Sequence, residues 1–430
     1  MTVGNERFFY MRPVNGDDSN DGLSFNTAWK TWTKVIDELC TDGTSYGGSA
    51  DNAGLYLVNE TGDAGYTGPY PTGLSVSTTV DWAFTSIGNR FTLLGLSADG
   101  SFDADINFIF DLSGFTGSNW YLAFLKYTGT TELSFRNITW RNATTSTNYI
   151  FNTGYDNEIG SLDFYRCIFE DNELNSGLVA VGGYSNVDRY YNCIVRRNNT
   201  YNNNYGLFPA GSYSVTTNRQ PGSWFYRSII HDNQTDPSAS QYTLNTNSLG
   251  GQGIELVDCA IYNNGNVSTD ITIFLHHQDE RAQNKIKGCV FFNNAGTAVY
   301  VDGAISIDAL YGRSSFGHRF QGNVFAYNNK SIEFEYEPGL RDTHITNNIF
   351  WQNTAVDIPT YIDGVTGMEG ANYVVDPEFT NGYSGDFSVP ETSPCFTYAG
   401  PLGLAIGGIF VNKISTGGGG GSTAEYVTVF

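Results

Sequence analysis

The sequence is poor in positive charge and in proline. Its 430 residues contain 22 Lys and Arg against 44 Asp and Glu, a formal net charge of −22, and only 12 Pro. A chain this acidic repels phosphate backbones and anionic lipid head groups, so we expect it to bind neither nucleic acids nor membranes in general. No apolar run approaches the length of a membrane span, and the first residues lack the basic start and apolar stretch of a secretion signal.

Cysteine is also scarce. The six Cys residues include no CxxC pair, which argues against a disulfide scaffold and against a zinc ribbon. Glycine and aromatic residues are plentiful, with 50 Gly and 15% Phe, Trp and Tyr. This balance is typical of a large β protein with many tight turns.

The middle of the chain repeats itself. Eight segments share one pattern: SFRNITWRN, FYRCIFEDN, YYNCIVRRN, FYRSIIHDN, LVDCAIYNN, IKGCVFFNN, FQGNVFAYN and ITNNIFWQN. The small fourth residue of each segment, here called the anchor, recurs about every 30 residues: Asn137, Cys167, Cys193, Ser228, Cys259, Cys289, Asn323 and Asn348. The next residue is aliphatic in all eight segments, and the fifth residue after the anchor is always Asn: Asn142, Asn172, Asn198, Asn233, Asn264, Asn294, Asn328 and Asn353.

Such a repeat predicts a solenoid with one coil for each repeat. A short strand cannot bury its apolar face alone, but strands stacked about 4.8 Å apart pair their backbones and align like side chains. The aliphatic column is then expected to form a continuous core. The Asn column is expected to mark a bend, because Asn tolerates the left-handed conformation and its amide can bond to the next coil.

The pattern resembles the right-handed parallel β-helix of the pectate-lyase-like superfamily, which also occurs in phage virion proteins and tailspikes. The fold class is therefore expected to be all-β, a right-handed parallel β-helix solenoid with a short N-terminal capping helix. That helix is predicted near Thr31–Leu39, with Trp32, Ile36 and Leu39 on one face. We expect residues 1–45 to form the N-terminal strand, turn and capping helix, 46–410 the parallel β-helix, and 411–430 a Gly-rich linker with a β-prone tail.

Two columns of charged residues are the candidate catalytic site. Glu170, Arg196 and His231 follow one another from coil to coil, and so do Asp171, Arg197 and Asp232. Two coils would place Asp171 and Asp232 about 9.5 Å apart, the upper edge of the carboxyl separation in inverting glycosidases. Arg197 between them could keep one carboxylate ionised while the other serves as an acid. The alternative is a surface ladder of salt bridges.

Other residues carry weaker signals. Three aromatic residues, Trp140, Tyr262 and Trp351, are predicted to be exposed and to stack on sugar rings. The Cys column is interpreted as a buried reduced stack rather than as metal ligands, and the adjacent His276 and His277 as part of a polar loop rather than a metal pair.

Neither a cofactor nor a metal is predicted, although the turn with Asp17 and Asp21 partly matches a calcium loop. In the tail, Tyr426, Val427, Val429 and Phe430 are candidates for adding a strand to a partner, and a frayed end is the alternative.

Two functions follow from the resemblance. The first is a structural virion protein, that is, a phage capsid decoration, fibre or tail component. Such a protein is made in the host cytoplasm, which suits the missing secretion signal. Its expected partners are other virion proteins and, as in many β-helices, two further copies in a homotrimer.

The alternative is a β-helix that binds or degrades surface polysaccharide as a lyase, a hydrolase or a tailspike depolymerase. A surface adhesin is a third reading. Pectate-lyase-like enzymes generally use Asp-bound calcium with an Arg or Lys base, but no such motif aligns here. The sequence alone therefore favours a non-enzymatic role.

Overall fold

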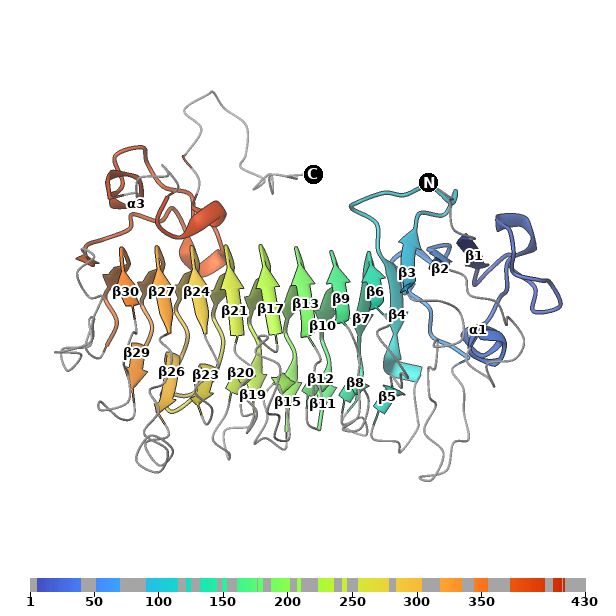
Figure 1. Ribbon diagram of the computed structural model, residues 1–430, viewed down its shortest axis with the longest axis horizontal. Coiled ribbons are helices and arrows are strands. Elements are labelled where there is room, and N and C mark those ends of the chain that lie inside the picture. The colour runs from blue at the N-terminus through green and yellow to red at the C-terminus, as the bar shows by residue number, and fades with distance from the viewer. Residues whose placement is uncertain are drawn as a thin grey trace.

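The computed structural model describes a single row of coils. The described residues are 6–39, 52–69, 90–114, 121–124, 132–144, 149–152, 161–175, 177–180, 187–201, 207–209, 223–235, 242–245, 254–277, 284–303, 318–334, 344–354, 372–398, 405–411 and 413. The strands lie side by side along the long axis in chain order, from blue to red in Figure 1. Every paired strand is parallel to its neighbours.

Two long sheets form two sides of the solenoid. Sheet A contains β1 (Glu6–Met11), β2 (Asn52–Val58), β3 (Arg90–Leu96), β6 (Glu132–Arg136), β9 (Ser161–Tyr165), β13 (Val187–Tyr191), β17 (Ser223–Tyr226), β21 (Ile254–Val257), β24 (Lys285–Lys287), β27 (Arg319–Gln321) and β30 (His344–Thr346). Sheet B contains β4 (Phe108–Asp111), β7 (Ile138–Arg141), β10 (Ile168–Glu170), β14 (Ile194–Arg196), β18 (Ile229–His231), β22 (Ala260–Tyr262), β25 (Val290–Phe292), β28 (Val324–Ala326), β31 (Ile349–Trp351) and β32 (Tyr373–Val374).

Shorter sheets close the third side. They are β5 (Tyr121–Phe124), β8 (Tyr149–Asn152) and β12 (Gly177–Ala180); β11 (Glu173–Leu174), β15 (Asn199–Thr200) and β19 (Gln234–Thr235); and β16 (Phe208–Pro209), β20 (Tyr242–Asn245), β23 (Ile271–His277), β26 (Thr297–Gly303) and β29 (Lys330–Phe334). The predicted all-β, parallel β-helix solenoid is confirmed.

The described residues contain two α-helices, α1 (Trp32–Leu39) and α3 (Pro394–Thr397). The first is the predicted capping helix, and it buries Trp32, Ile36 and Leu39. Thr31 caps its start, because its Oγ1 accepts a hydrogen bond from the backbone N–H of Lys34, and the Asp18 carboxylate in turn accepts bonds from Thr31. Neither helix is long and apolar enough to cross a membrane.

Each of the eight repeats turns at two left-handed corners, and Asn residues stack beside them. From Asn172 to Asn353 the Asn column is a continuous ladder, in which each Nδ2 donates to the Oδ1 of the next Asn. The left-handed residue is the one before each ladder Asn, for example Asp171 at φ 55° and Asp232 at φ 53°. The Asn side chains therefore hold the bend by bonding across coils, and the preceding residues supply its conformation.

Asn142 does not belong to this ladder. The register pairs Ile168 with Thr139, so Asn172 follows Ala143 rather than Asn142 in the stack. Asn142 instead occupies the left-handed position, at φ 60°, and donates to Asp111. The sequence alignment of the first repeat is one residue out, because Asn137 is a left-handed corner residue at φ 52° and corresponds in register to Arg166, the residue before the next anchor, rather than to Cys167.

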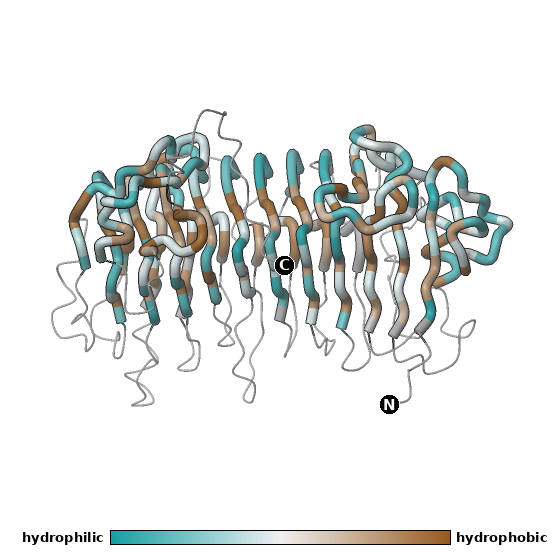
Figure 2. The backbone as a smooth tube through the Cα atoms, turned by 90° about the horizontal axis from the view of Figure 1, so that it is seen from above, coloured by the Kyte–Doolittle hydropathy of each residue, from teal (hydrophilic) through white to brown (hydrophobic). Residues whose placement is uncertain are grey.

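Apart from Ile138, which is fully buried inside the solenoid, the aliphatic column does not form the core, contrary to the prediction. Ile168, Ile194 and their equivalents point outward from sheet B, whereas the following residues, such as Phe169 and Val195, fill the interior. From Ile229 onward the outward column is buried under residues 376–398 and 405–411, here called the C-terminal segment. Figures 1 and 2 show this segment and the N-terminal residues over opposite ends of the row, with the middle coils between them.

Candidate functional site

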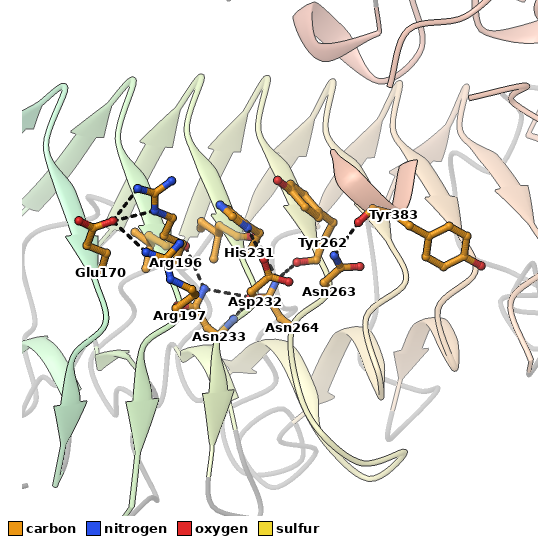
Figure 3. A network of polar contacts seen from close by, with 12 residues as sticks. Glu170, Arg196, Arg197, His231, Asp232, Asn233, Tyr262, Asn263, Asn264 and Tyr383 are labelled. Carbon is orange, nitrogen blue, oxygen red and sulfur yellow. Dashed lines mark hydrogen bonds and ion pairs between the residues drawn. The ribbon is translucent and has the colours of Figure 1, made fainter. Parts of the chain in front are cut away.

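The predicted charged residues lie together on the outer face of sheet B, between the two covered ends. The register pairs Glu170 with Arg196 and Arg196 with His231. Glu170 Oε2 accepts from Arg196 Nε at 2.8 Å and from Nη2 at 2.6 Å (Figure 3). Glu170 is mostly buried, with 8% of its surface exposed, so this carboxylate depends on its arginine partner for charge compensation.

Asp171 and Arg197 form the second charged pair. Arg197 Nε and Nη2 each lie 2.7 Å from one Asp171 oxygen, a bidentate contact, and Nη2 also lies 3.2 Å from Glu170. The hydrogen bond from Arg197 lowers the pKa of Asp171, so this carboxyl stays ionised. Asp171 is therefore unsuited to be the acid of a two-carboxylate mechanism.

Asp232 pairs with a histidine instead of with Arg197. His231 Nδ1 lies 2.7 Å from Asp232 Oδ2, and the imidazole stacks on Tyr262 with ring centroids 4.8 Å apart. Burial lowers the pKa of His231 despite this carboxylate, so the ring is neutral at pH 7. A neutral imidazole whose Nδ1–H is held by a carboxylate presents Nε2 as a base. The six residues form the charged row: Glu170, Asp171, Arg196, Arg197, His231 and Asp232.

The C-terminal segment borders the charged row. Asn263 Nδ2 donates to Tyr383 O at 3.0 Å, and Tyr262 packs edge-on against Phe387. Figure 3 shows the charged row running toward Tyr262 and Tyr383. At the other end, Arg141 Nε lies 3.0 Å from Asp111, so alternating charges continue along sheet B.

The aromatic residues predicted as sugar platforms are not exposed. Trp140 is 1% exposed and stacks on Phe169 inside the solenoid, because the register of the first repeat turns it inward. Tyr262 faces outward but is 8% exposed under the C-terminal segment, and Trp351 packs against the same apolar cluster. The exposure expected of Trp140 and Tyr262 was wrong, and Trp351 is only partly exposed.

A second surface, absent from the sequence predictions, lies on the outer face of sheet A. Tyr165, Tyr191 and Tyr226 occupy one register position on β9, β13 and β17, and we call them the tyrosine row. Their rings are parallel within 7° to 9°, with centroids 4.7 and 5.1 Å apart. All three are half-buried, and burial raises their pKa, so each hydroxyl stays protonated.

Cations and an indole surround the tyrosine row. The Arg136 guanidinium lies 4.6 Å from the centre of the Tyr165 ring. Arg189 lies 5.0 Å from the centre of the Trp224 ring and 3.6 Å from Asp163. The signal for this surface was present in the sequence, since the second residue before the anchor is Tyr in three consecutive repeats. A period-two reading of those strands places that position outward.

The remaining predicted residues lie elsewhere. The four column cysteines are fully buried, and burial raises the pKa of Cys167 and Cys289, as expected of a reduced stack. Asp17 and Asp21 accept hydrogen bonds within their own turn, from Ser19 and Thr27.

Among the described residues no group of three or more His, Cys, Asp or Glu could hold a metal ion. The interpretation of His276 and His277 as part of a polar loop was wrong, because both are strand residues that end β23 and pair with β26. The tail residues Tyr426, Val427, Val429 and Phe430 lie outside the described residues.

Comparisons with known proteins give distant matches. No protein-family model and no curated protein matches the chain. A GH136 lacto-N-biosidase from Eubacterium ramulus matches with 12% identity, 86% of this chain and 68% of that chain covered, and a TM-score of 0.31. A rhamnogalacturonan lyase matches with 12% identity, 87% and 90% covered, and a TM-score of 0.37. At these values the matches say nothing about function. The function is therefore inferred from the charged row and the tyrosine row.

Proposed function

We propose that this protein binds polysaccharide chains along the outer face of sheet A, over the tyrosine row. The observation that carries the proposal is the regular file of three half-buried phenols next to Trp224. Successive coils present the same hydroxyl group about every 4.8 Å, which suits a linear polymer that repeats its own hydroxyl groups. Tyr and Trp also bury a large area while keeping a polar group available, as binding surfaces require.

The charge around the tyrosine row favours an acidic polysaccharide. Arg136, Arg166, Arg189 and Arg227 lie on these coils or at their corners, in a chain with twice as many acidic as basic residues. Of the nearby carboxylates, Asp163 is 7% exposed beside Arg189, and Glu255 is paired with Lys285 at 2.6 Å. Because Asp163 compensates Arg189, and Glu255 compensates Lys285, we assign the attraction of an anionic polymer mainly to Arg136 beside the Tyr165 ring.

Changing all three tyrosines of the row to Phe tests this proposal without disturbing the stack. We expect the triple variant to lose at most a few degrees of melting temperature, because the Tyr226 hydroxyl also bonds to Glu255. We expect it to lose about tenfold or more in affinity, since each lost hydrogen bond costs about 0.5–1.5 kcal/mol. The affinity is measured by calorimetry against polygalacturonate, alginate, hyaluronan and dextran. Gln321→Ala, an exposed change on the same sheet, is the matched control. Equal affinity of the triple variant and the control would reject the tyrosine row as the binding site.

We also propose that any cleavage of polysaccharide occurs at the charged row on sheet B, a surface separate from the tyrosine row, with His231 as the base and Asp232 as the group that orients it. Asp232→Asn should lower the cleavage rate about 100-fold, the usual scale of general base catalysis. Because burial lowers the pKa of His231, activity should persist below pH 6.5 and fall only when the ring becomes protonated. The release of reducing ends over pH 4–8 measures both effects, and unchanged cleavage by the variant excludes this pair.

The structural virion role stays a prediction. Its argument from the sequence used the linker and the terminal tail, and residues 414–430 lie outside the described part of the chain. The homotrimer, the virion location and the virion partners likewise remain expectations. The tyrosine row is the feature that makes us favour polysaccharide binding, a function that a tailspike could combine with a place in a particle.

A further inference from the structure

The outer face of sheet A carries aromatic side chains at two places. One is the tyrosine row with Trp224. The other lies at the N-terminal end, on β1 and β2, where the rings of Phe8 and Tyr56 stack at 5.1 Å and Tyr10 lies 4.9 Å from Tyr56. Phe8 is 37% exposed, and the two tyrosines are half-buried. We call these three residues the N-terminal aromatic cluster.

A glycine allows Phe8 to lie across the sheet. Gly54 is the register partner of Phe8 on β2, and a Cβ atom at Gly54 would lie 3.0 Å from Phe8 Cδ1. Any larger residue would push the ring away from the sheet. Gly54 therefore lets the Phe8 ring lie flat over β2, next to Tyr56.

Small side chains connect the two aromatic places. After Phe8, the same outward register position holds Gly54, Thr92, Ser134 and Asp163, and only then Arg189 and Trp224. The parallel position holds larger groups throughout: Tyr10, Tyr56, Leu94, Arg136, Tyr165, Tyr191 and Tyr226. A chain lying along the solenoid axis would rest on the small residues and contact the larger ones from the side.

This arrangement has a defined length. Six strand-to-strand steps separate β1 from β17. At about 4.8 Å for each step, Phe8 and Trp224 are roughly 29 Å apart. A disaccharide cannot contact both, whereas a polymer lying along the axis can.

On the basis of the polysaccharide binding proposed above, we propose that the N-terminal aromatic cluster and the tyrosine row form one elongated platform that a single chain occupies from end to end. The platform selects long chains over short oligosaccharides. Once a long chain is bound at the tyrosine row, its contact with the N-terminal aromatic cluster forms within the same complex and needs no second binding event. Short chains bind at the tyrosine row alone.

The test compares chain lengths in two variants. Polygalacturonate, alginate, hyaluronan and dextran are each fractionated from disaccharides to long oligomers, and the affinity of every fraction is measured for the wild type, Tyr56→Ala and Gln321→Ala. Longer chains offer more binding registers to any site, so the decisive quantity is the ratio of variant to wild-type affinity at each length. We expect Tyr56→Ala to leave short fractions within about twofold and to weaken long fractions on the order of tenfold.

The outcomes separate this inference from the proposed function. If no fraction of any polymer binds the wild type, the proposed function fails. If long and short fractions bind but Tyr56→Ala weakens them equally, or weakens neither, the elongated platform is overturned while the tyrosine row stands. If Tyr56→Ala lowers the melting temperature, the same comparison is made with Phe8→Ala. That change removes an exposed ring from the edge strand β1.

Discussion

Replacing Asp188 by Asn is expected to stabilise the protein at pH 8 by on the order of 4 kcal/mol. Asp188 points into the solenoid from β13, has no exposed surface, and accepts a hydrogen bond from Ser223 Oγ at 2.8 Å. Burial raises its pKa to about 7, from an ordinary value of 3.8. The amide of Asn has the shape of the protonated acid and cannot ionise, so the variant avoids a charge in the core at alkaline pH.

The pH dependence gives this prediction its sign. The folded protein holds a proton on Asp188 up to about pH 7, whereas the unfolded chain releases it near pH 4. The contribution of Asp188 to the free energy of unfolding is therefore largest below pH 4 and decreases as the pH rises toward 7. Above pH 7 it no longer changes. Denaturant unfolding at pH 4, 6 and 8 should show the variant and wild type converging at low pH and separating at high pH. A gap that does not change with pH would contradict the burial of an ionisable carboxyl at this position.

Replacing Asn233 by Ala should destabilise the protein by a similar amount, on the order of 4 kcal/mol, because several buried polar groups lose partners at once. Asn233 Oδ1 accepts from the backbone and side chain of Asn198, and its Nδ2 donates to Val195 O and to Asn264 Oδ1, all at 3.0–3.1 Å. The residue is 1% exposed, so water cannot replace these bonds. The midpoint of guanidinium unfolding measures the loss.

Asn142 provides the matched control for that experiment. It occupies the same place in the sequence repeat but lies outside the ladder, at φ 60°, with one side-chain bond to Asp111. Asn142→Gly suits that conformation and should cost about 1 kcal/mol or less. If the two variants are equally destabilised, the ladder contributes no more than an ordinary turn residue does.

The repeat made the coil order predictable, because an Asn at a fixed offset in every segment has a physical role only if coils stack in register. The direction of the side chains was harder to predict. The aliphatic residue after each anchor looks like core, yet it faces outward, and its burial depends on a C-terminal segment more than 100 residues away in sequence from Ile229. Contacts that distant leave no periodic pattern in the strand itself.

The candidate site shows the same contrast. The neighbours within the first charged column followed from the repeat, and the register pairs Glu170, Arg196 and His231 as expected. In the second column, Asp171 contacts Arg197 as expected. The repeat did not predict the partner of Asp232. Whether this carboxylate contacts His231 or Arg197 depends on side-chain rotamers, which the spacing of residues cannot determine. Trp140 was misplaced for a simpler reason: the corner residue Asn137 was taken as the anchor, and a shift of one residue exchanges the inward and outward faces of a strand.

Oxidative footprinting of the protein with and without bound polysaccharide tests the central claim most directly. Hydroxyl radicals label accessible aromatic rings, and mass spectrometry then reports the labelling of Tyr165, Tyr191, Trp224 and Tyr226 against that of Tyr383 and Tyr398 on the C-terminal segment. The account predicts that a bound chain protects the four residues of sheet A and leaves the two on the C-terminal segment unchanged. Protection of the C-terminal segment with sheet A still labelled would show that the chain binds elsewhere, and the proposed function of the tyrosine row would have to be abandoned.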